Sequence, residues 1–477
     1  MSQAHFDALK AAGLEEHLLC PGDASYEERV QSWWSAAARL RPSCIFRPKT
    51  PEHVSKALSV LSRLDLGRFA IRSGGHSVWA GGSNVDDGLT IDLGHLNQVT
   101  YHKDSGTVSL GPGQRWGTVY EMLEPHGVVV AGGRIPDAGV GGLVTGGGIS
   151  FYAGRSGFAC DTVVNFQVVL ADGRIVDANV TSNSDLWKAL KGGSGNLGIV
   201  TRIDMEAFQG TQIWGGSQIS DRAYAGDAIR ALVNFSKVCA DHPGRPYAIC
   251  NGYDPLIKVE EPFLHQILVD VDGVVEPPVF KECRAIPAMM HDLQVRSMAH
   301  ISNSMALPSG RGGFWLTLTT KVDARIMQKS VDLHEAFIAD MSRVMPATDF
   351  VANNVWQLMP SNISDSSVKR GGNVLGLDAV EGHYMLWVLI VMTKSSEFEK
   401  QVHQLTIGMK DSLGEYAASV DGLLPWQYLN YADATQNPLK SYGPENLAFL
   451  RQVSQKYDPS GFFQTKFPGG FTLARAG

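Results

Sequence analysis

The sequence lacks paired cysteines, an excess of basic residues and a long apolar run, and each absence excludes a class of protein. Its six cysteines lie far apart, with no CxxC pair and no histidine at metal-ligand spacing, so we expect no metal site. The formal net charge of −7 argues against nucleic acid as a partner, because phosphates require a concentrated basic face. No apolar run approaches the roughly 18 residues of a membrane span. We therefore expect a partner that is a small, largely uncharged molecule.

What remains is the composition of a globular enzyme. Apolar residues make up 44% of the chain and charged residues 19%, and 477 residues are enough for two domains. Residues 1–19 carry Asp and Glu among apolar residues at helical spacing, which predicts a surface helix rather than a signal peptide. We therefore expect a cytoplasmic protein, with no prediction of its oligomeric state.

The patterning changes along the chain and predicts its organisation. Residues 1–207 alternate short β-rich runs with glycine clusters, as in RFAIRS and FQVVLADGRIV. Residues 208–420 alternate longer helical patterns with strongly apolar strands such as HYMLWVLIVMT, which is typical of an antiparallel sheet covered by helices. Residues 421–477 begin with a tyrosine-rich stretch and indicate a return to the first domain. The fold class predicted is α+β with two domains.

Three glycine-rich segments lie in the first part of the chain. They are 71–83 (IRSGGHSVWAGGS), 132–152 (GGRIPDAGVGGLVTGGGISFY) and 191–202 (KGGSGNLGIVTR). Paired glycines let backbone N–H groups approach a diphosphate closely, although any one loop by itself is equally typical of a turn in a β-rich domain. A GxGxxxG match at Gly111–Gly117 contains proline and lacks the βαβ unit of a Rossmann fold, so we do not assign it to a dinucleotide.

At these segments the sequence resembles a known family. RSGGHS, GVGGLVTGGG followed by GFACDTV, DLWKALKGGSGNLGIVT and the tail motif YLNYAD match the berberine-bridge-enzyme-like branch of the FAD-linked oxidases, in the same order and spacing. That branch has the vanillyl-alcohol-oxidase/p-cresol-methylhydroxylase (PCMH) type of FAD-binding fold. The resemblance covers about residues 40–206 and 420–470, and the segment GGNVLGLD is similar to fungal oxidases of secondary metabolism and to 6-hydroxynicotine-oxidase-like proteins.

The resemblance implies which residues hold FAD. His76 would be bonded to the 8α carbon of the flavin, and an imidazole there withdraws electrons and raises the flavin's ability to accept hydride. The alternative is a loop histidine that is hydrogen-bonded to the backbone. The implied cofactor-binding residues are Arg72, Ser73, Gly74, Gly75, His76, Ser77, Gly142, Gly146, Gly147, Asp161, Gly198, Ile199, Val200 and Asn430.

Many relatives attach FAD a second time, through a cysteine in a GxCPxxGVGG context. Ile135 stands at that position here, so the resemblance implies a single covalent bond, through His76. Cys160 is expected to be a small buried side chain rather than a second attachment point. Single attachment argues against a carbohydrate oxidase, and the small Ala138 near the flavin leaves room for O2, which favours an oxidase over a dehydrogenase.

The resemblance is less specific about which residue accepts the substrate's proton and which residues contact the substrate. Tyr428 and Tyr431 match the family's YxN(Y/H) element and are the candidate bases, although a phenol needs a nearby cation or hydrogen-bond donors to act as one. One of the two is expected to pack on the flavin instead. Relatives place substrate contacts in comparable strands, so the resemblance implies four candidate substrate contacts: Tyr152, Gln357, Asn373 and Asp378.

The function predicted is an FAD-dependent oxidase. It would transfer hydride from a C–N or C–O carbon of a small, mainly apolar, aromatic or heterocyclic metabolite to FAD, and O2 would reoxidise the flavin to give H2O2. The alternatives are oxidative or redox-neutral ring formation, a carbohydrate oxidase and, from another class, a flavin carrier without catalysis.

Overall fold

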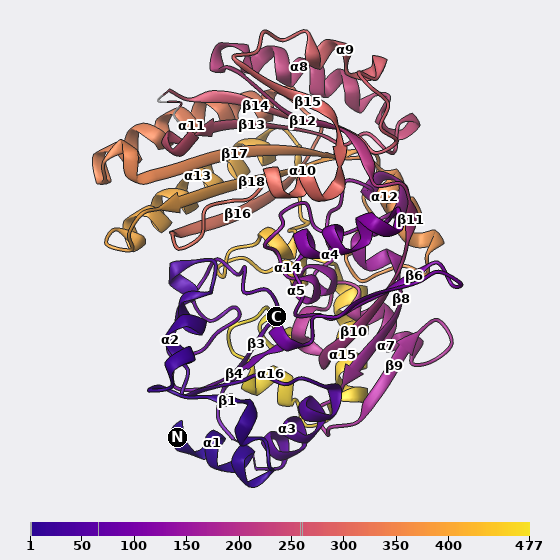
Figure 1. The fold of residues 1–477 in the computed structure, drawn as a ribbon. Helices are drawn as coiled ribbons and strands as arrows, with labels where there is room; N and C mark the ends of the chain where they lie inside the picture. The colour runs from indigo at the N-terminus through magenta and orange to yellow at the C-terminus, as the bar shows by residue number, and fades with distance from the viewer. Residues whose placement is uncertain (1, 65, 258, 260) are drawn as a thin grey trace.

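Two sheet systems face each other in the computed structural model, which describes residues 2–64, 66–257, 259 and 261–477 (Figure 1). The lower half in Figure 1 holds a four-stranded sheet in the order β1-β2-β4-β3 and a five-stranded sheet in the order β5-β6-β10-β8-β9. The upper half holds an eight-stranded sheet in the order β15-β12-β14-β13-β17-β18-β16-β19. Mixed helix and sheet in two halves confirms the predicted α+β class.

The two smaller sheets come from the first two hundred residues. In the four-stranded sheet β2, β3 and β4 are parallel to one another, whereas the five-stranded sheet is antiparallel throughout. Their strands are β1 (Leu18–Leu19), β2 (Cys44–Phe46), β3 (Phe69–Arg72), β4 (Leu89–Asp92), β5 (Val99–His102), β6 (Thr107–Leu110), β8 (Val163–Val169), β9 (Ile175–Asn179) and β10 (Ile199–Glu206). Two short strands, β7 (Val128–Val129) and β11 (Phe208–Gln209), pair separately.

Helices of this half close the edges and ends of these sheets. They are α1 (Ser2–Ala11), α2 (Ala24–Gln31), α3 (Pro51–Arg63), α4 (Trp116–Leu123), α5 (Val140–Thr145), α6 (Ala153–Ser156) and α7 (Ser184–Leu190). α3 shows why the sequence starts a helix where it does. Thr50 caps it by accepting a hydrogen bond of 3.3 Å from His53 N, and Pro51 occupies the first turn. Its face with Val54 and Leu58 is buried.

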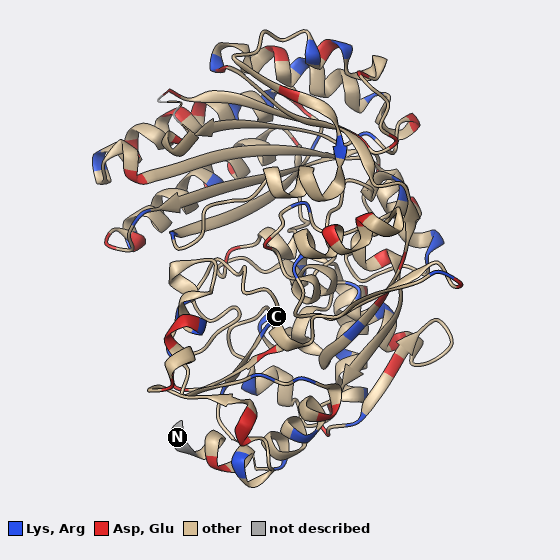
Figure 2. Cartoon of the chain, in the orientation of Figure 1, with Lys and Arg blue, Asp and Glu red and all other residues tan. Residues whose placement is uncertain are grey.

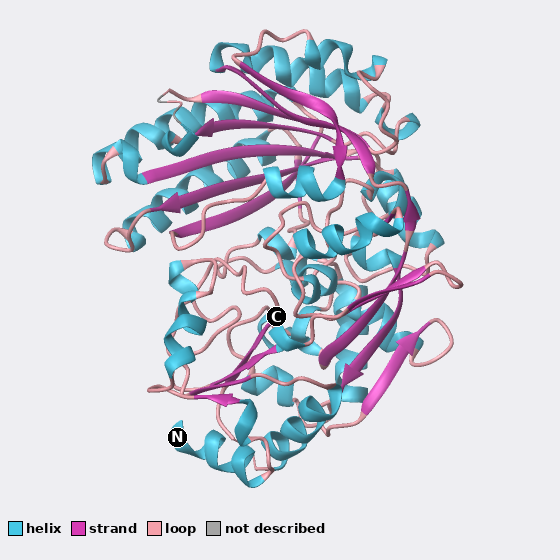
Figure 3. Cartoon of the chain, in the orientation of Figure 1, coloured by secondary structure: helices cyan, strands magenta, loops and turns pink. Residues whose placement is uncertain are grey.

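The eight-stranded sheet is antiparallel in every pairing, and helices cover its outer face (Figure 3). β18 lies between β17 and β16, and nearly all of its residues are buried, as expected for a strand covered on both faces. The strands are β12 (Gln212–Asp221), β13 (Tyr247–Tyr253), β14 (Phe263–Asp270), β15 (Met290–Ser297), β16 (Gly312–Lys321), β17 (Phe350–Met359), β18 (Tyr384–Thr393) and β19 (Leu423–Leu424). The predicted antiparallel sheet with a helical cover is confirmed.

The helical cover and the inner face have different roles. α8 (Ala225–Ser236), α9 (Lys281–Arg284), α11 (Ala324–Val344) and α13 (Glu399–Ser419) supply the outer layer, and their apolar faces form one core with the sheet. On the inner side α10 (Met298–Ser304) contacts α4, where Asn303 Nδ2 donates to Glu121 Oε1 at 2.9 Å. α12 (Asn362–Lys369) packs against α6. These inner contacts join the two halves.

The end of the chain returns to the lower half, where Figure 1 shows it in yellow among the first elements of the chain. It contains α14 (Pro438–Ser441), α15 (Pro444–Tyr457) and α16 (Phe462–Lys466). Phe462 stacks on Phe69 of β3 with ring centroids 5.1 Å apart, so the tail shares the core of the four-stranded sheet. The domain boundaries near residues 207 and 420 stay a prediction; the eight-stranded sheet runs from Gln212 to Leu424.

Candidate functional site

A cavity of about 280 Å³ lies between the glycine-rich segments, the tail and the inner face of the large sheet. All three glycine segments contribute to its wall, and Trp315 of β16 closes it from the sheet side. Of the residues expected to bind a cofactor or to act as a base, those in the wall are Ser73, Gly74, Gly75, His76, Ser77, Gly142, Gly198, Ile199, Val200, Tyr428, Asn430 and Tyr431. Residues distant in sequence therefore meet at one site.

Two glycine segments touch backbone to backbone at the cavity. A Cβ on Gly139 would lie 2.2 Å from Gly74 N, and a Cβ on Gly74 would lie 2.6 Å from the Gly139 backbone. Ser73 strengthens the contact, because its hydroxyl donates to Pro112 O and accepts from Gly141 N at 3.1 Å. This close approach requires glycine and leaves backbone groups at the cavity wall, as a diphosphate cradle does.

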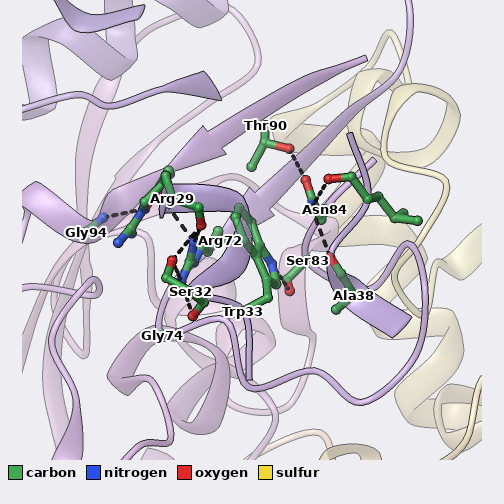
Figure 4. Close-up of polar contacts among 12 residues, drawn as sticks. Arg29, Ser32, Trp33, Ala38, Arg72, Gly74, Ser83, Asn84, Thr90 and Gly94 are labelled. Carbon is green, nitrogen blue, oxygen red and sulfur yellow. Dashed lines mark hydrogen bonds and ion pairs between the residues drawn. The ribbon is translucent and has the colours of Figure 1, made fainter. Parts of the chain in front are cut away.

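Arg72 differs from its expected place. Its side chain is fully buried behind the loop, with the guanidinium 3.6 Å from the centre of the Trp33 ring and Nη2 donating to Ser32 O at 3.0 Å (Figure 4). Burial lowers the pKa of Arg72 to about 9, which Asp92 partly offsets. Arg72 is not part of the cavity wall; it supports the loop from beneath.

His76 faces the cavity and is enclosed by aromatic rings. Its ring stacks on Trp34 with centroids 4.4 Å apart, and Trp315 meets it edge-on at 6.1 Å. Burial lowers the pKa of His76 to about 4, so the imidazole is neutral at pH 7. Its Nε2 is buried without a hydrogen-bond partner among the described residues. A neutral, unpartnered ring nitrogen in a cavity wall fits the expected bond to a flavin carbon, and the residues here fit FAD.

The tail residues Tyr428 and Asn430 tie the tail to the second glycine segment. Tyr428 Oη accepts hydrogen bonds from Gly148 N at 3.1 Å and from Ile149 N at 3.0 Å. Asn430 Nδ2 adds a third at 3.1 Å and also donates to a backbone carbonyl of the segment. A Cβ on Gly146 would lie 2.2 Å from Asn430 Oδ1, so Gly146 is needed for this contact rather than for the cavity wall. Burial raises the pKa of Tyr428.

Tyr431 has a different environment from Tyr428. It is half-buried, and Arg134 Nη2 donates to its Oη at 2.6 Å. The same Nη2 donates to Gln357 Oε1 at 2.6 Å, which turns the amide nitrogen of Gln357 towards the phenol oxygen at 3.3 Å. Gln357 is therefore close to the site through Tyr431, although it does not line the main cavity.

Ile135 and Ala138 both line the cavity, and Cys160 does not. Cys160 is fully buried, and burial raises the pKa of its thiol well above the ordinary value. The side chain at the position of the relatives' second attachment therefore faces the site but has no sulfur.

Two of the predicted residues pair with each other away from the cavity, and a third lies at the surface. Asp161 Oδ1 accepts from Asn373 Nδ2 at 3.0 Å, and burial raises its pKa. This pair connects the turn after the second glycine segment to the loop that follows α12, and neither residue lines the cavity. Asp378 is exposed.

The remaining two predicted residues shape the second glycine segment. Tyr152 is buried and stacks on Phe208 with centroids 5.8 Å apart. Gly147 has a φ of +108°, a backbone conformation that residues with a side chain rarely adopt. Neither lines the cavity.

Sequence reasoning missed Arg134, Trp315, Phe467 and Phe471 of the cavity wall. Arg134 could have been found from the sequence, because it is a charged residue inside a glycine-rich segment and directly precedes Ile135. The other three are apolar residues of a strand or of the tail, which no local pattern distinguishes from core residues.

Among the described residues, neither the distribution of charge nor a group of metal-ligating side chains indicates a second site. Lys, Arg, Asp and Glu are interspersed over both halves (Figure 2). Within the described ranges, no group of three or more His, Cys, Asp or Glu could hold a metal ion. No helix in the described part of the chain is both long enough and apolar enough to cross a membrane.

Comparison with known proteins points to one cofactor. A family model described as an FAD binding domain matches residues 42–179. The FAD-dependent monooxygenase drtC of Aspergillus calidoustus is 35% identical, over 98% of this chain and 90% of its own. The structure of 6-hydroxy-D-nicotine oxidase from Arthrobacter nicotinovorans superposes with a TM-score of 0.79 at 18% identity, covering 95% of this chain and 97% of that one. Glucooligosaccharide oxidase from Acremonium strictum gives 0.79 at 19%, covering 98% and 99%.

Proposed function

Because the chain belongs to the FAD-linked oxidoreductases with the vanillyl-alcohol-oxidase/PCMH fold, we propose that it is an oxidase with FAD attached covalently and only to His76. The substrate would be a small, mainly apolar, aromatic or heterocyclic metabolite. When bound, FAD accepts hydride from a C–N or C–O carbon of the substrate and passes the electrons to O2, which leaves as H2O2. The observation that carries the proposal is the neutral, half-buried His76 ring in the cavity wall, whose buried Nε2 has no hydrogen-bond partner among the described residues.

The chain's own residues bind and orient. The two loops that meet at Gly74 and Gly139 would hold the diphosphate, because both glycines line the cavity and neither has a side chain to block its backbone. Trp34 fixes the plane of the His76 ring by stacking on it. Only one attachment is proposed because Ile135 carries no nucleophile.

Tyr431 is the proposed proton acceptor, and Tyr428 is not. Three N–H groups already point at Tyr428 Oη, which leaves no acceptor site even on the ionised oxygen, whereas two point at Tyr431 Oη. Tyr431 Oη lies at the cavity, where the Arg134 guanidinium stabilises negative charge on the oxygen. Tyr431, in its ionised form, would take a proton from the substrate while the substrate also loses a hydride to the cofactor, which balances a two-electron oxidation.

The test is anaerobic reduction of the purified holoenzyme by a panel of aromatic, heterocyclic and sugar donors, followed by admission of air. We expect the flavin absorption to bleach with aromatic or heterocyclic donors and to return with one H2O2 per product. Bleaching by sugars alone would contradict the substrate class. A colourless protein, or a flavin that air does not reoxidise, would contradict the oxidase.

A monooxygenase is the second candidate, because the relative from Aspergillus calidoustus is named one. The two candidates differ in the fate of oxygen. Turnover under isotopically labelled O2 leaves the product unlabelled if H2O2 is released, whereas a monooxygenase places one labelled atom in the product.

A further inference from the structure

Arg134 lies where the main cavity meets a second hollow of about 40 Å³. It lines both, and Gln357 lines the second hollow. The side chain is half-buried in the second glycine segment. Its charge is therefore presented to the space in which a substrate would lie next to Tyr431.

Only part of the guanidinium is used by the protein. Nη2 donates to Tyr431 and Gln357, both at 2.6 Å. Both hydrogen bonds of the side chain come from Nη2, and none from Nε or Nη1 to the described residues. An arginine has five N–H groups in a planar fork that matches a carboxylate or another anionic oxygen.

No carboxylate within the described part of the chain pairs with Arg134. Nearby arginines do have one: Arg115 pairs with Asp137 at 3.0 Å, and Arg245 pairs with Asp270. Gln357 is neutral, and Tyr431, which carries charge only in its ionised form, contacts Nη2. The other N–H groups of the guanidinium are therefore free to bind an anionic ligand.

The position of Arg134 is fixed before any ligand binds. Ser302 Oγ of α10 donates to Arg134 O at 3.1 Å, and Tyr120 Oη donates to Gly133 O at 2.8 Å. The backbone is thus held from two sides, and Nη2 holds the end of the side chain. Such preorganisation reduces the entropy cost of binding.

We propose that Arg134 binds an anionic oxygen of the substrate, a carboxylate or an ionised acidic hydroxyl, through the N–H groups that the protein leaves unused. The inference rests on the proposed function and narrows its substrate class. Ile135, Ile149 and Trp315 line the same cavity and suit an apolar body. The substrate is then an aromatic or heterocyclic acid or acidic phenol, rather than the largely uncharged molecule that composition suggests.

Matched ligands that do not turn over test this directly by isothermal titration calorimetry on the holoenzyme. One pair is benzoate and benzamide; the other is 4-cyanophenol, at a pH where it is ionised, and benzonitrile. We expect the anion of at least one pair to bind about 10- to 100-fold more tightly than the neutral member, the range of a charge-assisted contact. The pair that shows the preference distinguishes a carboxylate from an acidic hydroxyl.

Variants assign the preference to Arg134. Arg134→Gln should abolish it, and Arg134→Lys, which keeps the charge but loses the fork, should retain part of it. Arg230→Gln is the matched control: that arginine is exposed on α8 and pairs with Asp227 at 2.7 Å, so its loss should leave the preference unchanged. Flavin content and circular dichroism show that each variant is folded, and Arg134→Lys keeps the test decisive if Arg134→Gln does not fold.

Three results would overturn the inference. The first is equal binding of anion and neutral ligand by the unchanged enzyme. The second is an anion preference that persists in Arg134→Gln. In the third, Arg134→Gln alters the flavin spectrum in the absence of ligand and weakens both ligands equally, which would show that the guanidinium faces FAD. None of these results concerns turnover, so the oxidase proposal fails only in its own test.

Discussion

Replacing each of the two tail tyrosines by phenylalanine should separate stability from catalysis. Tyr428→Phe removes the oxygen that accepts from Gly148 N and Ile149 N, and leaves both backbone donors buried and unpaired. Each such donor costs about 1–3 kcal/mol, so the free energy of unfolding should fall by roughly 2–6 kcal/mol. Asn430 keeps its bond to Leu143 O at 3.0 Å and adds little to the loss.

Tyr431→Phe should behave in the opposite way. Its oxygen is half-buried at a cavity, where water can replace it as a partner of Arg134, so the free energy of unfolding should change by less than about 1 kcal/mol. Loss of the proton acceptor should lower kcat by roughly 10²- to 10⁴-fold.

The assay combines urea unfolding of the holoenzyme, followed by tryptophan fluorescence, with the rate of flavin reduction by a donor found in the panel. A shared unfolding midpoint for both variants would refute the stability argument. A Tyr428→Phe variant that is stable but slow, beside a fast Tyr431→Phe variant, would show that the roles are reversed.

Three further predictions follow from the cavity and from buried histidines. His76→Ala should release FAD on acid denaturation, whereas the unchanged protein and Cys160→Ala should keep the flavin on the precipitated chain; flavin left on the His76→Ala precipitate would place the bond elsewhere. Ile135→Cys puts a thiol in the cavity wall and should add a second flavin bond, seen as flavin that stays attached to the chain in an Ile135→Cys/His76→Ala double variant. Burial lowers the pKa of His334, which is fully buried, and of His265, which is half-buried on β14, to about 4, below the unfolded value near 6.5; stability present above pH 6.5 should therefore be lost as the pH falls towards 4. That loss is at most about 3 kcal/mol for His334 and smaller for His265, and His334→Gln should flatten the pH dependence of the urea midpoint.

The glycine-rich segments and the tail motif could be placed from the sequence because their signals are local. Gly74 and Gly139 face each other at a distance that no other residue permits, so their positions carry information that can be read without a structure. His76 could be singled out because it lies inside such a segment. The apolar strand β18 followed from the run HYMLWVLIVMT.

The group of Arg134, Gln357 and Tyr431 could not be predicted, because its members are far apart in the chain and meet only when the large sheet packs on the glycine segments. No local pattern shows which face of β17 carries Gln357 inward, since that depends on its register with β13 and β18. Asn373 lies in a loop after α12, and its amide donates to Asp161 rather than lining the cavity, so its contact with substrate stays a prediction.

The return of the tail has a consequence for how the protein is made. The tail supplies residues 428–432, Phe467, Gly470 and Phe471 of the cavity wall, and these are translated after all the other residues of that wall. A chain still on the ribosome has His76 but only an open-sided cavity around it. Flavin capture therefore follows translation of the tail, and a chain truncated before residue 428 should remain without flavin however well its first sheets fold.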